Sequence, residues 1–200
     1  MRLFYVPGAC SLASHIVARE AGLDIVLDKV EFGRERRTQS GRDYYAINPQ
    51  GSVPALELDS GEVLTENAVV MQYLAAQGAQ NNLAPAEGMT HWRLLETLNF
   101  IATELHKGFS PLFRKPSEDA RAGIVKNIES RFELLERKLA DKPFLLGEHF
   151  SIADAYAFVV LTWARKFQLP VSEKLQAYFQ RVVARPAVQQ ALAEEGLPTS

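Results

Sequence analysis

The sequence contains a single cysteine, Cys10, among its 200 residues, which excludes an intrachain disulfide. No apolar run approaches the roughly 20 residues needed to cross a bilayer. The formal net charge of −2 is too small to indicate binding to nucleic acid or to an anionic membrane. The N-terminus lacks the pattern of a secretion signal, so we expect a cytoplasmic protein whose thiol stays reduced.

Motifs of several common enzyme classes are also missing. The four histidines and the cysteine are not spaced as metal ligands, so no metal site is expected. There is no glycine-rich phosphate loop and no GxSxG nucleophile elbow. What remains is an ordinary globular composition, 47% hydrophobic and 23% charged, in a chain that suits one large domain or two small ones.

Residues 1–80 alternate the apolar patterns of strands and helices. The patterns predict strands at 3–6, 25–32, 53–58 and 62–64, and helices at 11–21, 42–47 and 66–76, the last with Thr65 as its N-cap. A helix between the first two strands implies that they are parallel, whereas the Asp-Ser-Gly turn at 59–61 implies an antiparallel hairpin. We therefore predict a mixed four-stranded sheet with helices as an α/β domain over 1–80.

The chain from residue 87 onward has no convincing strand pattern, and the Gly-, Asn- and Pro-containing segment 77–88 is the best linker candidate. Apolar periodicity predicts helices at 89–113, 120–139, 151–163, 175–184 and 186–194. Ser151 and Asp154 have the spacing of a capping box at the third of these. We predict an all-α helical bundle over 87–200.

Cys10 lies where the first predicted strand turns into the first helix, after Pro7-Gly8-Ala9. A free cysteine is most often a small buried apolar residue. At the first turn of a helix, however, the unpaired N–H groups and the helix dipole favour a thiolate. Both interpretations are open from this position alone.

Two other segments offer backbone groups to a ligand. Pro54 lies within a predicted strand and must therefore sit at an edge or a bend, where Val53 can pair with an extended peptide. Thr65-Glu66-Asn67 opens a helix, whose free N–H groups suit a carboxylate. Simple capping of the helix is the alternative for the second segment.

A polar stripe runs along the first helix of the second half. Asn99, Thr103, His106 and Lys107 share one side of it. Such a stripe usually faces water. Leu105 and Phe109 flank these residues, however, so the alternative is that His106 and Lys107 line a cleft. A cation in such a cleft would favour the thiolate form of a nearby cysteine.

Taken together, these segments resemble the beta-class bacterial glutathione S-transferases over essentially the whole chain. The resemblance is carried by Pro-Gly-Ala-Cys-Ser, the Val-Pro turn, Leu-Thr-Glu-Asn and the run Ile101-Ala102-Thr103-Glu104-Leu105-His106-Lys107-Gly108-Phe109. It implies a thioredoxin-like N-terminal domain, a helical C-terminal domain and a homodimer. Glutathione is the implied co-substrate.

The resemblance also implies roles for individual residues. Cys10 faces the glutathione sulfur, with His106 and Lys107 as catalytic neighbours. The implied glutathione-binding residues are Cys10, Arg36, Val53, Pro54 (following a cis bond), Glu66, Asn67, Asn99, Thr103, Glu104 and His106. Arg36 replaces the lysine that the family usually has in a shorter loop. Phe109, Phe113 and Trp163 are candidates for an apolar substrate subsite and are equally compatible with bundle core.

We therefore predict a detoxifying transferase that conjugates glutathione to small hydrophobic or xenobiotic electrophiles. With Ala13 in place of a resolving cysteine, Cys10 can form a mixed disulfide with glutathione, so a thiol-disulfide or peroxidase side activity is expected. The alternatives are a glutaredoxin-like reductase and a non-enzymatic binding protein on the same fold.

Overall fold

A mixed sheet of four strands in the order β2-β1-β3-β4 is the centre of the N-terminal half. The computed structural model describes residues 1–33, 35–78 and 83–199. Its strands are β1 (Arg2–Tyr5), β2 (Val26–Lys29), β3 (Ala55–Glu57) and β4 (Val63–Leu64). β1 pairs with β2 in parallel and with β3 antiparallel, and β3 and β4 form the hairpin. The predicted sheet is confirmed.

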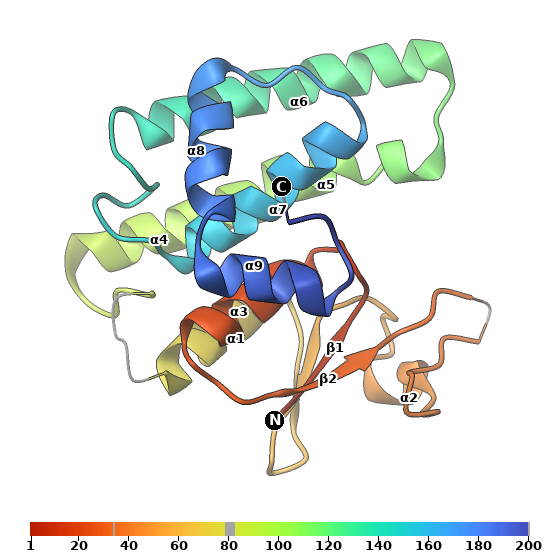
Figure 1. Cartoon of the computed structure of the whole chain (residues 1–200). Coiled ribbons are helices and arrows are strands. Elements are labelled where there is room, and N and C mark those ends of the chain that lie inside the picture. The colour runs from red at the N-terminus through yellow and green to blue at the C-terminus, as the bar shows by residue number, and fades with distance from the viewer. Residues whose placement is uncertain (34, 79–82, 200) are drawn as a thin grey trace. The chain divides into compact units, whose positions relative to one another are not determined.

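Each face of this sheet is covered by a different part of the chain. α1 (Ser11–Glu20) and α3 (Asn67–Gln77) pack side by side on one face (Figure 1). On the other face Phe4 packs with Tyr44 of the short α2 (Tyr44–Ile47) in an apolar cluster. Because side chains alternate along a strand, β1 supplies both faces. The predicted linker 77–88 falls partly on residues 79–82, which lie outside the described residues.

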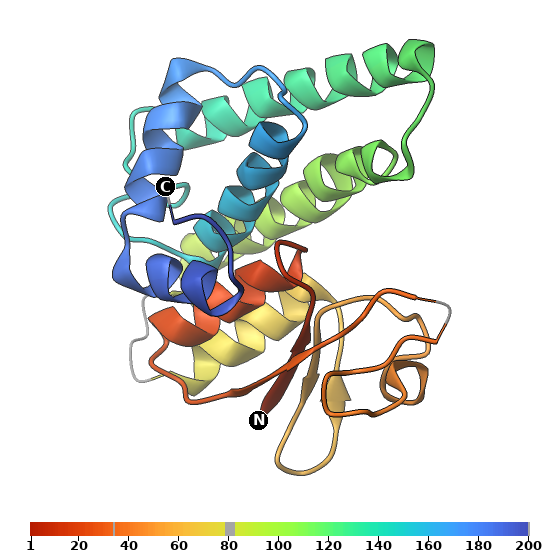
Figure 2. The same cartoon turned by 45° about the vertical axis from the view of Figure 1, so that its right-hand side comes forward.

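The chain divides into two compact units, Met1–Leu83 with Arg185–Ser200, and Ala84–Ala184. The first unit therefore includes α9 (Pro186–Glu194), which packs against α1 (Figure 2). This differs from the predicted boundaries of 1–80 and 87–200. The difference arises because α9 buries Val188, Ala191 and Leu192, and an apolar pattern does not say which domain its helix covers.

Polar side-chain contacts fasten the end of α9 and the residue after it to α1. The buried imidazole of His15 lies 2.6 Å from Glu194 Oε2 and 3.0 Å from Glu195 Oε1. Glu194 also accepts a hydrogen bond from Arg19 Nε at 2.8 Å. Glu195 is itself buried, so its carboxylate must be satisfied by such partners. The C-terminal segment is thus part of the N-terminal fold.

The second unit is entirely helical over the residues described, apart from an isolated bridge between Phe144 and Gly147. Its elements are α4 (Gly88–Phe100), the π-helix η1 (Ile101–His106), α5 (Lys107–Phe109), the 3-10 turn η2 (Leu112–Arg114), α6 (Glu118–Leu139), α7 (Ile152–Lys166) and α8 (Glu173–Val183). Nearly every residue of α7 is buried, so α7 is the core helix of this bundle. No helix in the described chain has the length and apolar character needed to span a bilayer.

The single helix predicted over 89–113 is in fact four consecutive elements. α4 continues into the π-helix η1, which is followed by α5 and η2. A π-turn admits one extra residue per turn and has no marker in the apolar pattern. Such turns occur frequently at functional sites, and this one holds three of the predicted site residues, Thr103, Glu104 and His106.

Ala140, the C-cap of α6, has φ 50° and ψ −131°, a conformation that strongly favours glycine. We expect Ala140→Gly to raise the free energy of unfolding by about 1 kcal/mol, because glycine adopts this backbone without steric cost. Urea denaturation measures the change. The control is Ala122→Gly at an exposed position in the second turn of α6, which is expected to cost about 1 kcal/mol. Loss of stability in both variants would contradict the assignment of strain to Ala140.

Candidate active site

Cys10 is the N-cap residue of α1, at the position predicted from the sequence. Its side chain is 9% exposed. Sγ lies 3.0 Å from the carbonyl oxygen of Val53, to which the thiol donates a hydrogen bond. The thiol is therefore placed both at the positive end of a helix dipole and beside the backbone of the Val-Pro turn.

The loop before Cys10 is fixed from two sides. Ser11 Oγ accepts a hydrogen bond from the backbone N–H of Val6 at 3.1 Å. The N–H of Gly8 donates to Glu195 Oε2 at 2.9 Å, and Gly8 has φ 68°, which favours glycine. Glu195 lies 187 positions away in the sequence, so no local pattern indicated this contact.

The Val53–Pro54 peptide bond is cis, as the resemblance implied. The preceding carbonyl, that of Ser52, accepts hydrogen bonds from Tyr44 Oη at 2.6 Å and from Asn48 Nδ2 at 2.7 Å. Tyr44 is fully buried, and burial raises the pKa of its phenol to about 12. These two donors hold the turn that presents Val53 to Cys10.

α3 begins one residue later than predicted, at Asn67, with Glu66 rather than Thr65 as its N-cap. Glu66 has φ 66°, a strained conformation that is concentrated at binding and catalytic sites. Asn67 is 7% exposed, and its Oδ1 accepts a hydrogen bond from Ser14 Oγ at 2.7 Å. Its Nδ2 has no partner among the described residues. A buried donor of this kind can bind an acceptor group of a ligand or a water molecule.

Arg36 lies above two aromatic rings. Its guanidinium carbon is 4.6 Å from the ring centre of Phe32 and 5.7 Å from that of Tyr45. Gly51 packs closely against Tyr45 and Arg36, and a larger residue would not fit there. A Cβ at this position would lie only 2.7 Å from Tyr45 Cε1 and 3.0 Å from Arg36 Nη1. The stacked arginine can therefore offer its N–H groups to an anion.

In the second unit, the predicted polar residues of η1 have partners of their own. Thr103 Oγ1 donates to the carbonyl of Asn99 at 3.0 Å. Glu104 forms an ion pair with Arg131 at 2.8 Å. Lys107 is exposed.

His106 is largely buried, with Nδ1 2.6 Å from Tyr156 Oη and its ring centre 5.0 Å from that of Trp163. Burial, and secondly the positive charge of Lys107, lower the pKa of His106 to about 4. The imidazole is therefore neutral at pH 7 and acts as a hydrogen-bonding group. Sequence reasoning missed Tyr156, which looked like one more residue of an apolar helix.

The neutral state of His106 predicts a loss of stability in acid. The unfolded chain takes up a proton on this residue near pH 6.5, whereas the folded chain does so near pH 4. Stability from this source is complete above pH 6.5 and is lost as the pH falls towards 4, by about 2 kcal/mol at pH 5.

We expect the free energy of unfolding, measured by urea denaturation, to fall less between pH 8 and pH 5 in His106→Asn than in the wild type. The control is His149→Asn, an exposed histidine whose removal should leave the wild-type loss unchanged. Equal losses in the wild type and His106→Asn would contradict the neutral assignment.

Of the three predicted substrate-subsite residues, only Phe113 is substantially exposed, at 46%. Trp163 is 4% exposed and Phe109 has no exposed surface, which places Phe109 in the core of its unit. The Phe113 and Trp163 rings meet edge to face with centres 5.4 Å apart. Across the part of the chain that the structure describes, no three His, Cys, Asp or Glu side chains gather to hold a metal ion.

A thioredoxin-like unit with a thiol at a helix N-terminus, followed by a helical unit, defines the class of two-domain thiol-dependent transferases. The family models for the N-terminal and C-terminal domains of glutathione S-transferase match residues 8–77 and 100–186. The chain belongs to the glutathione S-transferase family.

Individual relatives agree with this assignment. The chain is 46% identical to glutathione S-transferase GstA of Escherichia coli O157:H7 over 98% of its own length and 100% of the relative. It matches the structure of a ternary complex of BphK, a bacterial GST, at 45% identity with a TM-score of 0.94, covering 98% and 100% of the two chains. A bacterial beta-class enzyme from Sphingomonas chungbukensis matches at 40% identity, with a TM-score of 0.91 and coverage of 99% and 100%. The predicted beta-class transferase and its fold class are confirmed.

Proposed function

We propose that this protein adds the thiol of glutathione, as co-substrate, to small electrophilic compounds. The observation that carries the proposal is the 3.0 Å contact between Cys10 Sγ and the Val53 carbonyl at the N-terminus of α1. It places the thiol at a helix N-terminus, beside a backbone edge that can hold a cysteinyl peptide. The family membership makes glutathione the natural occupant of that edge.

Glutathione offers one carboxylate at each end, and the first unit offers a group for each. At the γ-glutamyl end, the unpartnered Asn67 Nδ2 and the N–H groups of α3 bind the carboxylate, and Glu66 binds the amine. At the glycyl end, Arg36 pairs with the carboxylate. Val53 pairs with the cysteinyl backbone between them, beside Pro54.

The second unit supplies the remaining assigned groups. His106, neutral at pH 7, can donate or accept a hydrogen bond, and Lys107 is the second residue that the resemblance assigns to catalysis. Asn99, Thr103 and Glu104 assist in binding. Phe113, packed against the buried ring of Trp163, presents aromatic surface that suits planar, apolar electrophiles. The role of the protein is then detoxification of xenobiotic compounds.

A second activity, disulfide reduction, is favoured by the thiol itself. The Cys10 thiolate attacks the glutathionyl sulfur of a mixed disulfide, and the substrate thiolate leaves and takes up a proton. A second glutathione thiolate then attacks the Cys10–glutathione disulfide, which releases glutathione disulfide and restores Cys10. No resolving cysteine is required.

The function is tested by calorimetric titration with glutathione, followed by parallel assays of aryl-halide conjugation and mixed-disulfide reduction. We expect saturable binding at one site per chain and measurable turnover in the conjugation assay. Absence of glutathione binding, together with the absence of a Cys10–glutathione adduct by intact mass, would leave a non-enzymatic role for the fold.

We further propose that the protein is a cytoplasmic homodimer. Both units expose large apolar side chains that a partner copy would cover: Val69 of α3 is 46% exposed, and Met89 and Trp92 of α4 are 67% and 63% exposed. Sedimentation equilibrium should give twice the chain mass, and Trp92→Glu should shift the population to monomer. A monomeric wild type would contradict this proposal.

A further inference from the structure

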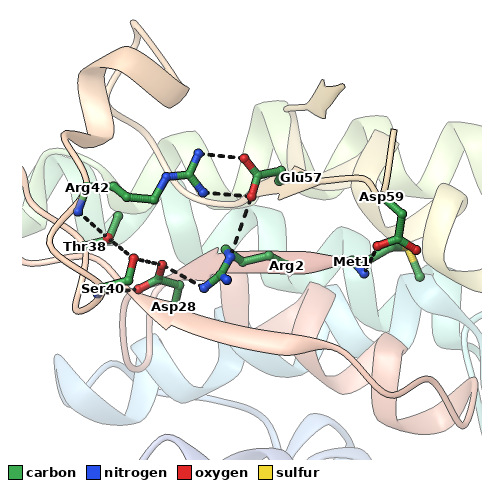
Figure 3. Close-up of polar contacts among 8 residues, drawn as sticks. All are labelled: Met1, Arg2, Asp28, Thr38, Ser40, Arg42, Glu57 and Asp59. Carbon is green, nitrogen blue, oxygen red and sulfur yellow. Dashed lines mark hydrogen bonds and ion pairs between the residues drawn. The ribbon is translucent and has the colours of Figure 1, made fainter. Parts of the chain in front are cut away.

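The loop that carries Arg36 is held to the sheet by four polar side chains, which we call the loop anchor. These are Asp28, Ser40, Arg42 and Glu57, drawn in Figure 3. Asp28 comes from β2 and Glu57 from β3, whereas Ser40 and Arg42 belong to the loop. The described residues of the loop form no regular strand or helix before α2, so its shape depends on contacts of this kind.

The first half of the loop anchor is a buried carboxylate. Asp28 is 2% exposed, and its oxygens accept hydrogen bonds from the backbone N–H of Ser40 at 3.1 Å and from Ser40 Oγ at 2.5 Å. Arg2 Nη1 supplies the charge partner at 3.2 Å. Because a buried carboxylate without such partners is costly, these bonds fix residue 40 against β2.

The second half is a two-bonded ion pair. Arg42 donates from Nη1 and Nη2 to the two carboxylate oxygens of Glu57, at 2.8 Å and 2.6 Å. The hydrogen bond from Arg42 lowers the pKa of Glu57, so the pair stays charged at neutral pH. The Arg42 guanidinium also lies 5.4 Å from the ring centre of Phe4. Bidentate geometry and stacking together restrict Arg42 to one orientation.

Thr38 joins the two halves. Its hydroxyl lies 2.8 Å from Ser40 Oγ and accepts a hydrogen bond from the N–H of Arg42 at 3.1 Å. Together with the bonds of Asp28 and Glu57, these contacts, visible in Figure 3, connect β2 and β3 to a single stretch of loop.

The loop anchor continues into the backbone of Arg36. The carbonyl of Arg36 accepts a hydrogen bond from the N–H of Tyr44 at 2.8 Å, directly after the anchored residues. The next residue, Arg37, pairs with Asp43 in an antiparallel bridge, and its carbonyl accepts from Glu31 N–H at 2.9 Å. The position of Arg36 is therefore set by a folded loop whose base is the anchor.

We propose that Arg42 and Glu57 are positioning residues that set the affinity of the site for the glycyl carboxylate through Arg36. The inference rests on the proposed function, because it takes Arg36 as the partner of that carboxylate. An anchored loop presents the guanidinium already in place, whereas a loose loop must be ordered when the ligand binds. The loop anchor thereby determines the preference for the tripeptide over its dipeptide precursor.

The experiment compares glutathione with γ-glutamylcysteine, which lacks the glycine, by calorimetric titration of Glu57→Gln and Arg42→Gln. Each variant should bind glutathione about five- to tenfold more weakly, while the affinity for the dipeptide changes less than about twofold. In kinetics, KM for glutathione should rise with kcat unchanged. The two substitutions change the net charge in opposite directions, so a shared loss cannot come from long-range attraction of an anionic ligand.

Three further variants complete the design. Arg36→Ala removes the guanidinium itself and sets the largest loss of glutathione affinity that is expected. Ser40→Ala is a conservative change that tests the other half of the loop anchor. The control is Asp59→Asn, which removes an exposed ion pair with the N-terminal amine, 2.7 Å away, and should leave both affinities unchanged.

Equal weakening of both ligands in the anchor variants would show general destabilisation and overturn the inference, as would unchanged affinities. A wild type that binds neither ligand would instead refute the proposed function. If Arg36→Ala binds glutathione normally, the glycyl assignment and the inference fail together while the function stands.

Discussion

Replacing Cys10 by alanine is expected to abolish the Cys10–glutathione mixed disulfide and to lower mixed-disulfide reduction by at least a factor of about 100. Conjugation to aryl halides should fall by less than about tenfold, because the glutathione thiol is itself the nucleophile there. The chain has no other cysteine, so intact mass reports this one thiol without background. Parallel assays of mixed-disulfide reduction and aryl-halide conjugation measure the difference between the two losses of activity.

The matched variant is Cys10→Ser, which keeps a hydrogen-bond donor towards the Val53 carbonyl but cannot form a disulfide. It should lose reduction as fully as Cys10→Ala and retain conjugation at least as well. If both variants lose the two activities equally, the thiol serves conjugation directly. If both retain reduction, Cys10 is an inert residue of the loop.

Replacing Asp154 by alanine is expected to lower the free energy of unfolding by about 3 to 5 kcal/mol. The carboxylate is fully buried and accepts four hydrogen bonds: from the N–H groups of Leu145 and Ser151, both at 2.8 Å, from Ser151 Oγ at 2.7 Å and from Tyr178 Oη at 2.8 Å. Alanine would leave these buried donors without an acceptor. Burial also raises the pKa of Asp154, which these bonds oppose.

Urea denaturation at a fixed protein concentration measures the effect. Ser117→Ala removes a comparable helix N-cap on the exposed start of α6 and should cost about 1 kcal/mol or less. If Asp154→Ala were no more destabilising than this control, the capping box would be a local feature of α7 and would not hold the bundle together. Glutathione affinity of the folded fraction should stay near that of the wild type.

The elements with a strong apolar period were predictable, and so was the position of Cys10. Burial of one face repeats along a helix or strand, so the order of strands and helices in the first 80 residues follows from local pattern. A strand-to-helix turn placed Cys10 at an N-cap without knowledge of any contact. The capping box of Ser151 and Asp154 could likewise be predicted from the sequence, because both partners lie within one helical turn.

The features that were missed depend on contacts far apart in the sequence or on backbone geometry without a sequence marker. Tyr156 is 50 positions from His106, and Ser14 is 53 positions from Asn67. The π-helix η1 inserts an extra residue where the apolar pattern continues unbroken. Thr65 was the better N-cap by residue type, yet Glu66 occupies that position in a strained conformation that residue preference disfavours.

The return of α9 to the first unit also bears on how the protein is made. Cys10 emerges early from the ribosome, but the carboxylate that holds Gly8 belongs to Glu195, which is synthesised 187 residues later. A nascent chain that stops after the helical unit therefore carries the thiol in a loop that lacks this contact. The hydrogen bond between Gly8 and Glu195 can therefore form only after almost the whole chain has been synthesised.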